Sequence, residues 1–166
     1  WHMEEPVAGA LIPTYFLAQR AGRHVKVVLV GEGADEIFGG YVRLKVLKGP
    51  WKYLCRGLAR WGYMRGLNTI GPREKAGLYS DQCRSRLGGH DPVGRYLSPY
   101  FNGSRSDLLS KALQFEQESE LPNHQLLRVD KLTMGHSVEA RVPFLDYKLV
   151  EYVNRLPSGF KIKGLN

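Results

Sequence analysis

One segment constrains the fold more than any other, an apolar run that leads directly into a glycine-rich acidic turn. Val25–Val30 is short, β-branched and almost wholly apolar, which is typical of a strand buried on both faces in a parallel sheet covered by helices. Gly31 and Gly33 allow the backbone to turn sharply after it. The turn contains three carboxylates, Glu32, Asp35 and Glu36. Open α/β sheets bind their ligands beyond the carboxyl ends of the strands, so we predict a functional site here.

The remainder of the chain is predicted to be mostly helical, with turns marked by glycine and proline. Helices are expected over residues 14–21, 34–38, 50–65, 107–117 and 124–136. A last helix should begin at Asp146, whose side chain can cap it, and end before Pro157. A helix that leads through a short loop into a buried strand is half of a βαβ unit, so a preceding strand is expected upstream of Trp1. Together these features predict the α/β class.

Composition places the chain among ordinary globular proteins, because 43% of its 166 residues are apolar and 24% are charged. The two cysteines, Cys55 and Cys83, lack both CxxC spacing and neighbouring histidines, so we interpret them as reduced thiols. No apolar run approaches the roughly 18 residues needed to span a bilayer, and the first residues do not resemble a signal peptide. We therefore expect a cytoplasmic protein without a membrane partner.

The net charge of +8 belongs to one segment of the chain. Residues 37–73 contain eight lysines or arginines and no acidic residue, and the remaining 16 basic residues equal the 16 acidic ones. Within this segment, residues 50–65 predict an amphipathic helix with Leu58 and Trp61 on its apolar side and basic residues opposite. Such a helix either binds an anionic partner, such as RNA or a membrane surface, or packs on the domain with a solvated charged face. The second interpretation is favoured because such faces are common, so a nucleic-acid partner is not expected.

The chemistry of the acidic turn indicates a divalent cation. Backbone amides at a glycine-rich turn attract phosphate, whereas carboxylates repel it. Mg²⁺ reconciles the two, since it binds one or two carboxylates and accepts substrate phosphates as further ligands. Asp35 is the predicted metal ligand, and Glu32 is then free to act as a general base or a charge stabiliser. The alternative is that all three acids only complement a helix dipole. A dinucleotide fingerprint is excluded, because Glu36 occupies the place of its third glycine.

Three segments resemble the glutamine-hydrolysing asparagine synthetases. Val27–Tyr41, with the sequence VVLVGEGADEIFGGY, closely resembles one signature of this family. Residues 1–6 and 12–17 resemble the family's sequence just upstream, and residues 127–146, which include EARVPFLD, resemble a later signature. The order and spacing of these segments match the family, whereas residues 44–121 match it only weakly.

The resemblance implies a carboxyl-terminal synthetase domain with a fold of the nucleotide α-hydrolase type, here mostly α-helical with one or few parallel strands. It implies that ATP adenylates the side-chain carboxylate of aspartate and releases pyrophosphate, after which ammonia displaces AMP to give asparagine. The cofactors would be ATP and Mg²⁺. The partners would be aspartate and ammonia, the latter supplied from glutamine by a separate glutaminase domain.

The resemblance also implies roles for residues of the acidic turn. Asp35 matches the ligand of Mg²⁺-pyrophosphate, and Glu36 is assigned to the same metal site or to support of the turn. Glu32 matches the acid that lies near the adenylate. The nucleotide would lie against the backbone of the turn, at Val30, Gly31 and Gly33.

Arg141 is the further catalytic candidate, since it lies in the later signature and can balance carboxylate or phosphate charge near the same site. An equally weighted alternative makes it a buried arginine paired with Asp130 or Glu139.

The chain also departs from the family. The Ser-Gly-Gly-x-Asp-Ser loop that binds pyrophosphate and the glutaminase are absent from residues 1–166, so this is expected to be part of a synthetase domain, inactive alone. Val30 replaces a serine or threonine, which leaves the acid substrate open. The alternatives are a related amidotransferase, a β-lactam-forming synthetase or a degenerate domain without catalysis. A homodimer, or self-association through the flank of Val25–Val30, is also expected.

Overall fold

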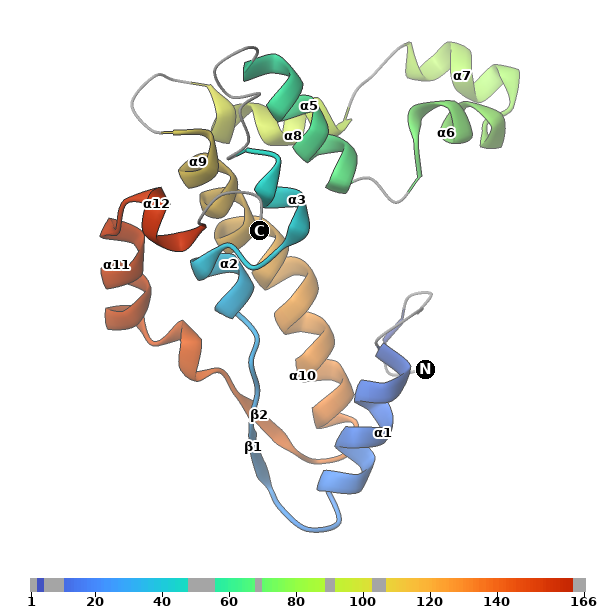
Figure 1. Cartoon of the computed structure of the whole chain (residues 1–166). Helices are drawn as coiled ribbons and strands as arrows, with labels where there is room; N and C mark the ends of the chain where they lie inside the picture. The colour runs from blue at the N-terminus through green and yellow to red at the C-terminus, as the bar shows by residue number, and fades with distance from the viewer. Residues whose placement is uncertain are drawn as a thin grey trace. The chain divides into compact units, whose positions relative to one another are not determined.

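The computed structural model describes residues 3–4, 11–47, 56–67, 70–88, 92–102 and 107–162 (Figure 1). The chain divides into two compact units. Unit 1 comprises Trp1–Gly39 and Leu113–Pro157, and unit 2 comprises Gly40–Ala112 and Ser158–Asn166. The acidic turn and the later signature therefore belong to the same unit, although more than 70 residues of unit 2 separate them in the sequence.

Unit 1 consists of helices around a pair of parallel strands. Its elements are α1 (Leu11–Ala21), β1 (Val27–Leu29), α2 (Ala34–Phe38), the π-helix η1 (Glu116–Leu126), α10 (Leu127–Met134), β2 (Glu139–Arg141), the 3₁₀ helix η2 (Pro143–Leu145) and α11 (Tyr147–Arg155). β1 and β2 are parallel, with Val27 opposite Glu139 and Leu29 opposite Arg141. The predicted combination of mostly helical structure with few parallel strands is therefore confirmed.

The connection from α1 to β1 is fixed by a close approach of two backbones. The N–H of Gly22 donates to the carbonyl of Ala18 and ends α1. A Cβ atom at Gly22 would lie 2.7 Å from the carbonyl oxygen of His136, so only glycine fits without a shift of the backbone. This contact joins the end of α1 to the segment that follows α10 and leads into β2.

The prediction that Val25–Val30 is a strand buried on both faces is wrong for this chain. The strand is shorter, and the side chains of Val27 and Leu29 are 40% and 73% exposed, while Val28 is half-buried. The reason is that β1 has one partner strand among the described residues, and α10 packs on only one face of the pair (Figure 1). Adjacent side chains of a strand point to opposite faces, so Val27 and Leu29 remain on the uncovered one.

The expected helices are found, with shifted ends. The helix predicted at 14–21 begins earlier, at Leu11, and α2 has the predicted bounds. The helices predicted at 107–117 and 124–136 correspond to α9 (Leu108–Phe115) and α10, which η1 connects. Asp146 caps α11 as predicted, since its carboxylate accepts from the N–H groups of Lys148 and Leu149. The long π-helix was not expected, because such helices are rare and have no simple sequence signal.

Unit 2 is wholly helical in its described part. It contains α3 (Val42–Lys45), α5 (Arg56–Leu67), α6 (Pro72–Leu78), α7 (Asp81–Leu87), α8 (Pro92–Phe101), the first part of α9 and α12 (Ser158–Lys161). Its fully buried side chains include Leu44, Tyr63, Leu97 and Leu109. None of the helices built from described residues is long and apolar enough to cross a membrane.

The predicted orientation of the basic helix is wrong in its described part, α5. Leu58 and Trp61, which were expected to face the core, are 56% and 58% exposed. Ala59 and Tyr63 are buried instead, and the Tyr63 ring lies 5.7 Å from that of Phe101. Glycines at 62 and 66 allow α5 to approach side chains at Val46 and Arg43 closely, so steric fit decides the buried face. Residues 50–55, including Cys55, lie outside the described residues.

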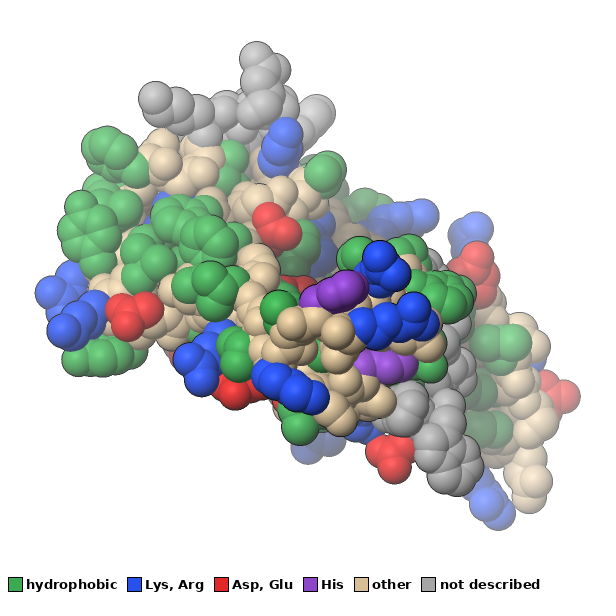
Figure 2. All heavy atoms as spheres, turned by 90° about the horizontal axis from the view of Figure 1, so that it is seen from below, with side chains coloured by type: hydrophobic (Ala, Val, Ile, Leu, Met, Phe, Trp, Pro, Cys, Tyr) green, Lys and Arg blue, Asp and Glu red, His purple; other side chains and the backbone are tan. Residues whose placement is uncertain are grey.

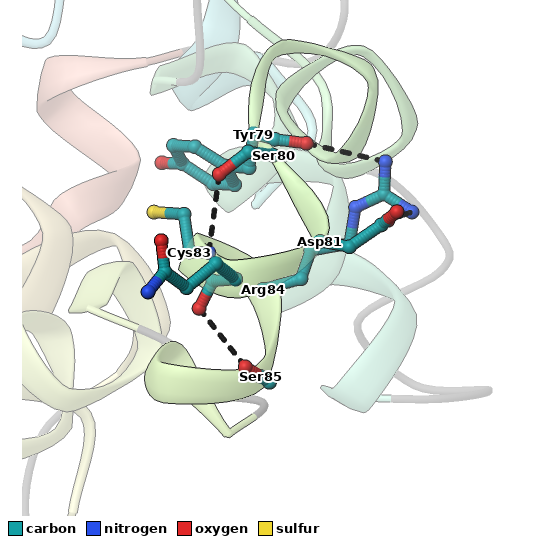
Figure 3. A network of polar contacts seen from close by, with 7 residues as sticks. Tyr79, Ser80, Asp81, Cys83, Arg84 and Ser85 are labelled. Atoms are coloured by element: carbon teal, nitrogen blue, oxygen red, sulfur yellow. Dashed lines mark hydrogen bonds and ion pairs between the residues drawn. The ribbon is translucent and has the colours of Figure 1, made fainter.

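Helices α6 and α7 form a hairpin held by short-range contacts (Figure 3). Ser80 caps α7 by accepting from the N–H of Cys83, at 3.3 Å. Arg84 donates to the carbonyl of Tyr79 and pairs with Asp81. Cys83 is a free, partly exposed thiol, in agreement with its interpretation as reduced.

Candidate functional site

The acidic turn begins where the two strands end. The N–H of Val30 donates to the carbonyl of Arg141 at 2.9 Å, so the carboxyl ends of β1 and β2 are joined at one edge of the sheet. The N–H of Ala34 then donates to the carbonyl of Gly31 at 3.3 Å and closes the turn into α2. A Cβ atom added at Gly31 would meet no atom within 4 Å. The predicted nucleotide contacts Val30 and Gly31 thus lie at the strand ends, as the sequence indicated.

Gly33 is required by the geometry of the turn for two reasons. Its φ of 93° lies in the left-handed region, where a side chain is disfavoured. A Cβ atom there would also clash with a methyl carbon of Leu145, which belongs to the later signature. Gly33 of the turn therefore packs against Leu145 of the later signature. The side chain of Leu145 occupies the space that a side chain at position 33 would need.

The three carboxylates of the turn have different environments. Asp35 is exposed and Glu32 is half-buried, whereas Glu36 is only 2% exposed. Asp35 and Glu36 belong to the five-residue helix α2, and Glu32 precedes it; the C-cap residue Gly39 closes the helix by donating its N–H to the carbonyl of Asp35 at 2.8 Å. Asp35 and Glu32 are therefore the acids accessible to a ligand, and Glu36 lies in the interior of unit 1.

The carboxylates of the turn suit a cation that is also bound by a substrate. Among the described residues, no group of three or more His, Cys, Asp and Glu side chains forms a metal site. Mg²⁺ that is shared with phosphates needs only one or two protein carboxylates, and the exposed Asp35 can supply one of them. The metal role of Glu36 stays a prediction, and its burial makes support of the turn the simpler role.

Arg141 lies at the same edge of the sheet, opposite Leu29. Its Nε donates to Oε1 of Glu139 at 2.8 Å, and the two side chains are 63% and 56% exposed. The hydrogen bond to Arg141, and then its charge, lower the pKa of Glu139, and the same contact raises the pKa of Arg141. The partner proposed in the alternative reading is thus present, but the arginine is not buried. An exposed ion pair is weak, so the guanidinium can exchange this partner for an anionic ligand.

The upstream and later segments of the resemblance are brought together by an ion pair. Nζ of Lys131 lies 2.8 Å from Oε2 of Glu4 and donates to the carbonyl of Met3 at 3.2 Å. The hydrogen bond from Lys131, and then its charge, lower the pKa of Glu4. These residues are 127 positions apart in the sequence, so the structure supports treating the separate segments as parts of one unit.

Two features near the turn were missed by sequence reasoning. The first is an amide pair, Gln117 and Asn154, that contacts the backbone of α2. No local signal marks it, because the partners are 37 and 81 positions apart.

The second feature is a basic cluster at the opposite end of β1. Figure 2 views the molecule from the α1–β1 connection, and lysine, arginine and histidine side chains gather on this face. Arg20 in the last turn of α1 and Arg23, His24 and Lys26 in the α1–β1 connection are all exposed. The net charge of the chain gave no sign of this cluster, because acidic residues elsewhere balance its positive charges. The two ends of β1 therefore carry opposite charges, with the acids at the carboxyl end.

Comparison with known proteins agrees with this geometry. A family model described as asparagine synthase matches residues 1–166. A putative glutamine-hydrolyzing asparagine synthetase of Mycobacterium tuberculosis is 35% identical over 188 residues, which cover 98% of this chain and 29% of that relative. The glutamine-hydrolyzing asparagine synthetase 1 of Bacillus subtilis is 31% identical, over 99% of this chain and 30% of its own length.

A more distant relative has a different name. The amidase chyE of Penicillium rubens is 28% identical, over 99% of this chain and 31% of its own length. The chain thus spans about three tenths of the length of these relatives. No solved structure gives a significant match.

Proposed function

The chain belongs to the asparagine synthase family, and from this premise we propose that it contributes the acidic half of a site that makes asparagine from aspartate, ATP and ammonia. The observation that carries the proposal is the edge of the β1–β2 pair, where Asp35 and Glu32 are accessible and the carbonyl of Arg141 accepts from the N–H of Val30 at the start of the turn. The side-chain carboxylate of aspartate is activated as an acyl-adenylate, because the oxygen of a carboxylate is a poor leaving group and AMP is a good one.

In this proposal the residues at this edge of the sheet have different roles. Bound Mg²⁺ would neutralise charge on the pyrophosphate that leaves. Asp35 would hold that ion, and Arg141 would balance the remaining anionic charge. The backbone of Val30, Gly31 and Gly33 lies against the nucleotide. Glu32 takes a proton from the attacking nitrogen as the carbon–nitrogen bond forms and the bond to AMP breaks, or it stabilises the positive charge on that nitrogen.

The test is the formation of AMP and pyrophosphate from ATP and aspartate by the complete protein in which this chain occurs. We expect Glu32→Gln to lower turnover by about 100-fold or more, the usual contribution of a positioned acid or base. Asp35→Asn should raise the Mg²⁺ concentration that half-saturates turnover. Asp81→Asn is the matched control, because Asp81 is also an exposed aspartate in the first turn of a short helix. Unchanged turnover in both test variants would remove Glu32 and Asp35 from the mechanism.

A second candidate keeps the adenylation and changes the acid. The 28% identity to amidase chyE favours it, together with the loss of a hydroxyl at Val30. A screen of carboxylic acids in the same AMP assay separates the two candidates, since aspartate should be preferred only by an asparagine synthetase. If no AMP forms with aspartate or with any other acid, the domain is degenerate and without catalysis. We also propose a cytoplasmic location, where ATP and aspartate are available.

A further inference from the structure

We propose that Gln117 is a positioning residue that holds the acidic turn in its working geometry. The inference rests on the proposed function, because it assigns Gln117 a part in presenting Asp35 and Glu32 to their ligands. Gln117 lies in the π-helix η1, far from the turn in the sequence, and no motif of the sequence includes it. Its side chain acts through the backbone of α2 and does not itself need to touch a substrate.

Helix α2 requires external support. It has five residues, whereas isolated helices shorter than about 12 residues are marginal even in favourable sequences. Its two ends are closed by backbone hydrogen bonds from the N–H of Ile37 to the carbonyl of Gly33 at 3.1 Å and from the N–H of Gly39 to the carbonyl of Asp35 at 2.8 Å. The orientation of Asp35 must therefore come from contacts with the rest of unit 1.

Gln117 supplies such a contact at the carboxyl end of α2. Its Nε2 donates to the carbonyl oxygen of Glu36 at 3.1 Å. This carbonyl belongs to the last turn, where a helix leaves its acceptors without partners of its own. The buried Ile37 packs the same helix into unit 1, so the hydrogen bond and the apolar contact hold α2 from successive residues.

Asn154 of α11 fixes the direction of the Gln117 amide. The second hydrogen of Nε2 is donated to Oδ1 of Asn154 at 3.1 Å, and Nδ2 of Asn154 donates back to Oε1 of Gln117 at 2.8 Å. If the Gln117 amide alone were reversed, its oxygen would face the carbonyl oxygen of Glu36 and Oδ1 of Asn154. Together these bonds keep Nε2 of Gln117 directed at the carbonyl of Glu36 in α2. They also connect α2 with both η1 and α11.

The first experiment measures hydrogen exchange at the amides of Ile37 and Gly39 in the complete protein. Gln117→Leu keeps the size of the side chain and removes its hydrogen bonds. We expect exchange at these two amides to be about fivefold faster, as for the loss of one neutral hydrogen bond. Gln114→Leu is the matched control, because Gln114 is an exposed glutamine one turn earlier, and its amide donates to Glu118 at 2.9 Å. The control should leave both amides unchanged.

The second experiment measures turnover and its dependence on Mg²⁺. A displaced Asp35 should lower kcat by about tenfold or more and raise the half-saturating Mg²⁺ concentration, because small errors in position are costly at reacting centres. The midpoint of global unfolding should match that of Gln114→Leu, which separates positioning from a general loss of structure. Asn154→Ala, at an exposed position, should shift the same quantities less, since the bond to Glu36 remains.

Two outcomes would overturn the inference. One is exchange at Ile37 and Gly39 that is the same in Gln117→Leu, Asn154→Ala and the control. The other is faster exchange with unchanged kcat and unchanged Mg²⁺ dependence, which would make the contact merely structural. Failure of the proposed function looks different, because the unsubstituted protein would then form no AMP from ATP and aspartate. In that event the exchange measurement alone decides whether Gln117 fixes the turn.

Discussion

Two short helices of this protein begin with an aspartate in their first turn, and they are held in place in opposite ways. In unit 2, α7 is stabilised by neighbours in the sequence: Ser80 caps it, and Arg84 contacts Asp81 and the carbonyl of Tyr79 (Figure 3). All seven residues of α7 are described, and none of them is buried.

In unit 1, α2 depends on residues that are distant in the sequence. Ile37 is fully buried, Gly33 fits against Leu145, and Gln117 donates to α2 from 81 positions away. A first-turn aspartate on a helix with only local contacts is an ordinary surface residue. The same residue on a helix that the tertiary structure holds in place is a candidate for a positioned ligand.

The largest effect is expected for the buried side chain of α2. Ile37→Ala should lower the free energy of unfolding by about 2–5 kcal/mol, because it removes buried methylene groups and leaves a cavity. Leu87→Ala, at a 41% exposed position of α7, should cost less than about 0.5 kcal/mol. Denaturant unfolding measures both. Equal costs would show that the two helices are supported alike.

A smaller difference in stability is expected between alanine substitutions at two glycines with positive φ, Gly33 before α2 and Gly88 after α7. Gly33→Ala should cost about 1–3 kcal/mol, since the backbone is left-handed and Leu145 must move. Gly88→Ala, with a φ of 53° and open space around it, should cost about 1 kcal/mol from the backbone alone. Thermal unfolding of the two variants measures the difference. Leu145→Ala should reduce the cost of Gly33→Ala if the steric contact is responsible for it.

Removal of the local cap should affect α7 alone. Ser80→Ala leaves the N–H of Cys83 without its side-chain acceptor, and we expect a loss of about 1 kcal/mol in the local stability of α7. Hydrogen exchange should be faster in α7 and unchanged in α2. If the α2 amides also exchanged faster, the contrast between locally and distantly supported helices would be incorrect.

The smallest effect concerns the exposed ion pair beside the acidic turn. The contact with Arg141 lowers the pKa of Glu139. The ion pair therefore contributes stability at pH values above the ordinary pKa of a glutamate, and this contribution is lost as the pH falls through the lowered pKa. Arg141→Gln should therefore move the pKa of Glu139 upward, as NMR titration of its carboxylate would show. A pKa that stays in place would mean that the contact does not persist in solution. Both groups are exposed, so we expect little change in global stability.

Signals that lie close together in the chain could be read from the sequence. The apolar run before Gly31, the acids after it and the capping residue Asp146 predicted a strand, a short helix and a last helix. The resemblance, carried by contiguous motifs, predicted the family that the comparisons then supported. Each of these features depends on neighbours within a few positions, and local chemistry is enough to recognise them.

Features that depend on distant packing were not predicted correctly. Leu29 was expected to be buried and is 73% exposed, because its burial depends on what covers the sheet. Trp61 of α5 was expected to face the core, whereas Ala59 and Tyr63 do so, because Gly62 and Gly66 let α3 approach that side. Periodicity shows that a helix has two faces, and it does not show which face has a complementary neighbour.

Asp35 and Glu36 show where the information in the sequence ends. The order of the residues is enough to show that two adjacent acids follow an apolar run and a glycine turn, and this chemistry predicts a metal and a nucleotide. The exposure of Asp35 and the burial of Glu36 follow from the packing of distant segments, in which Gln117 donates to the carbonyl oxygen of Glu36. Successive residues of a helix point about 100° apart, so the packing of η1 and α11 against one side separates a buried acid from an accessible one.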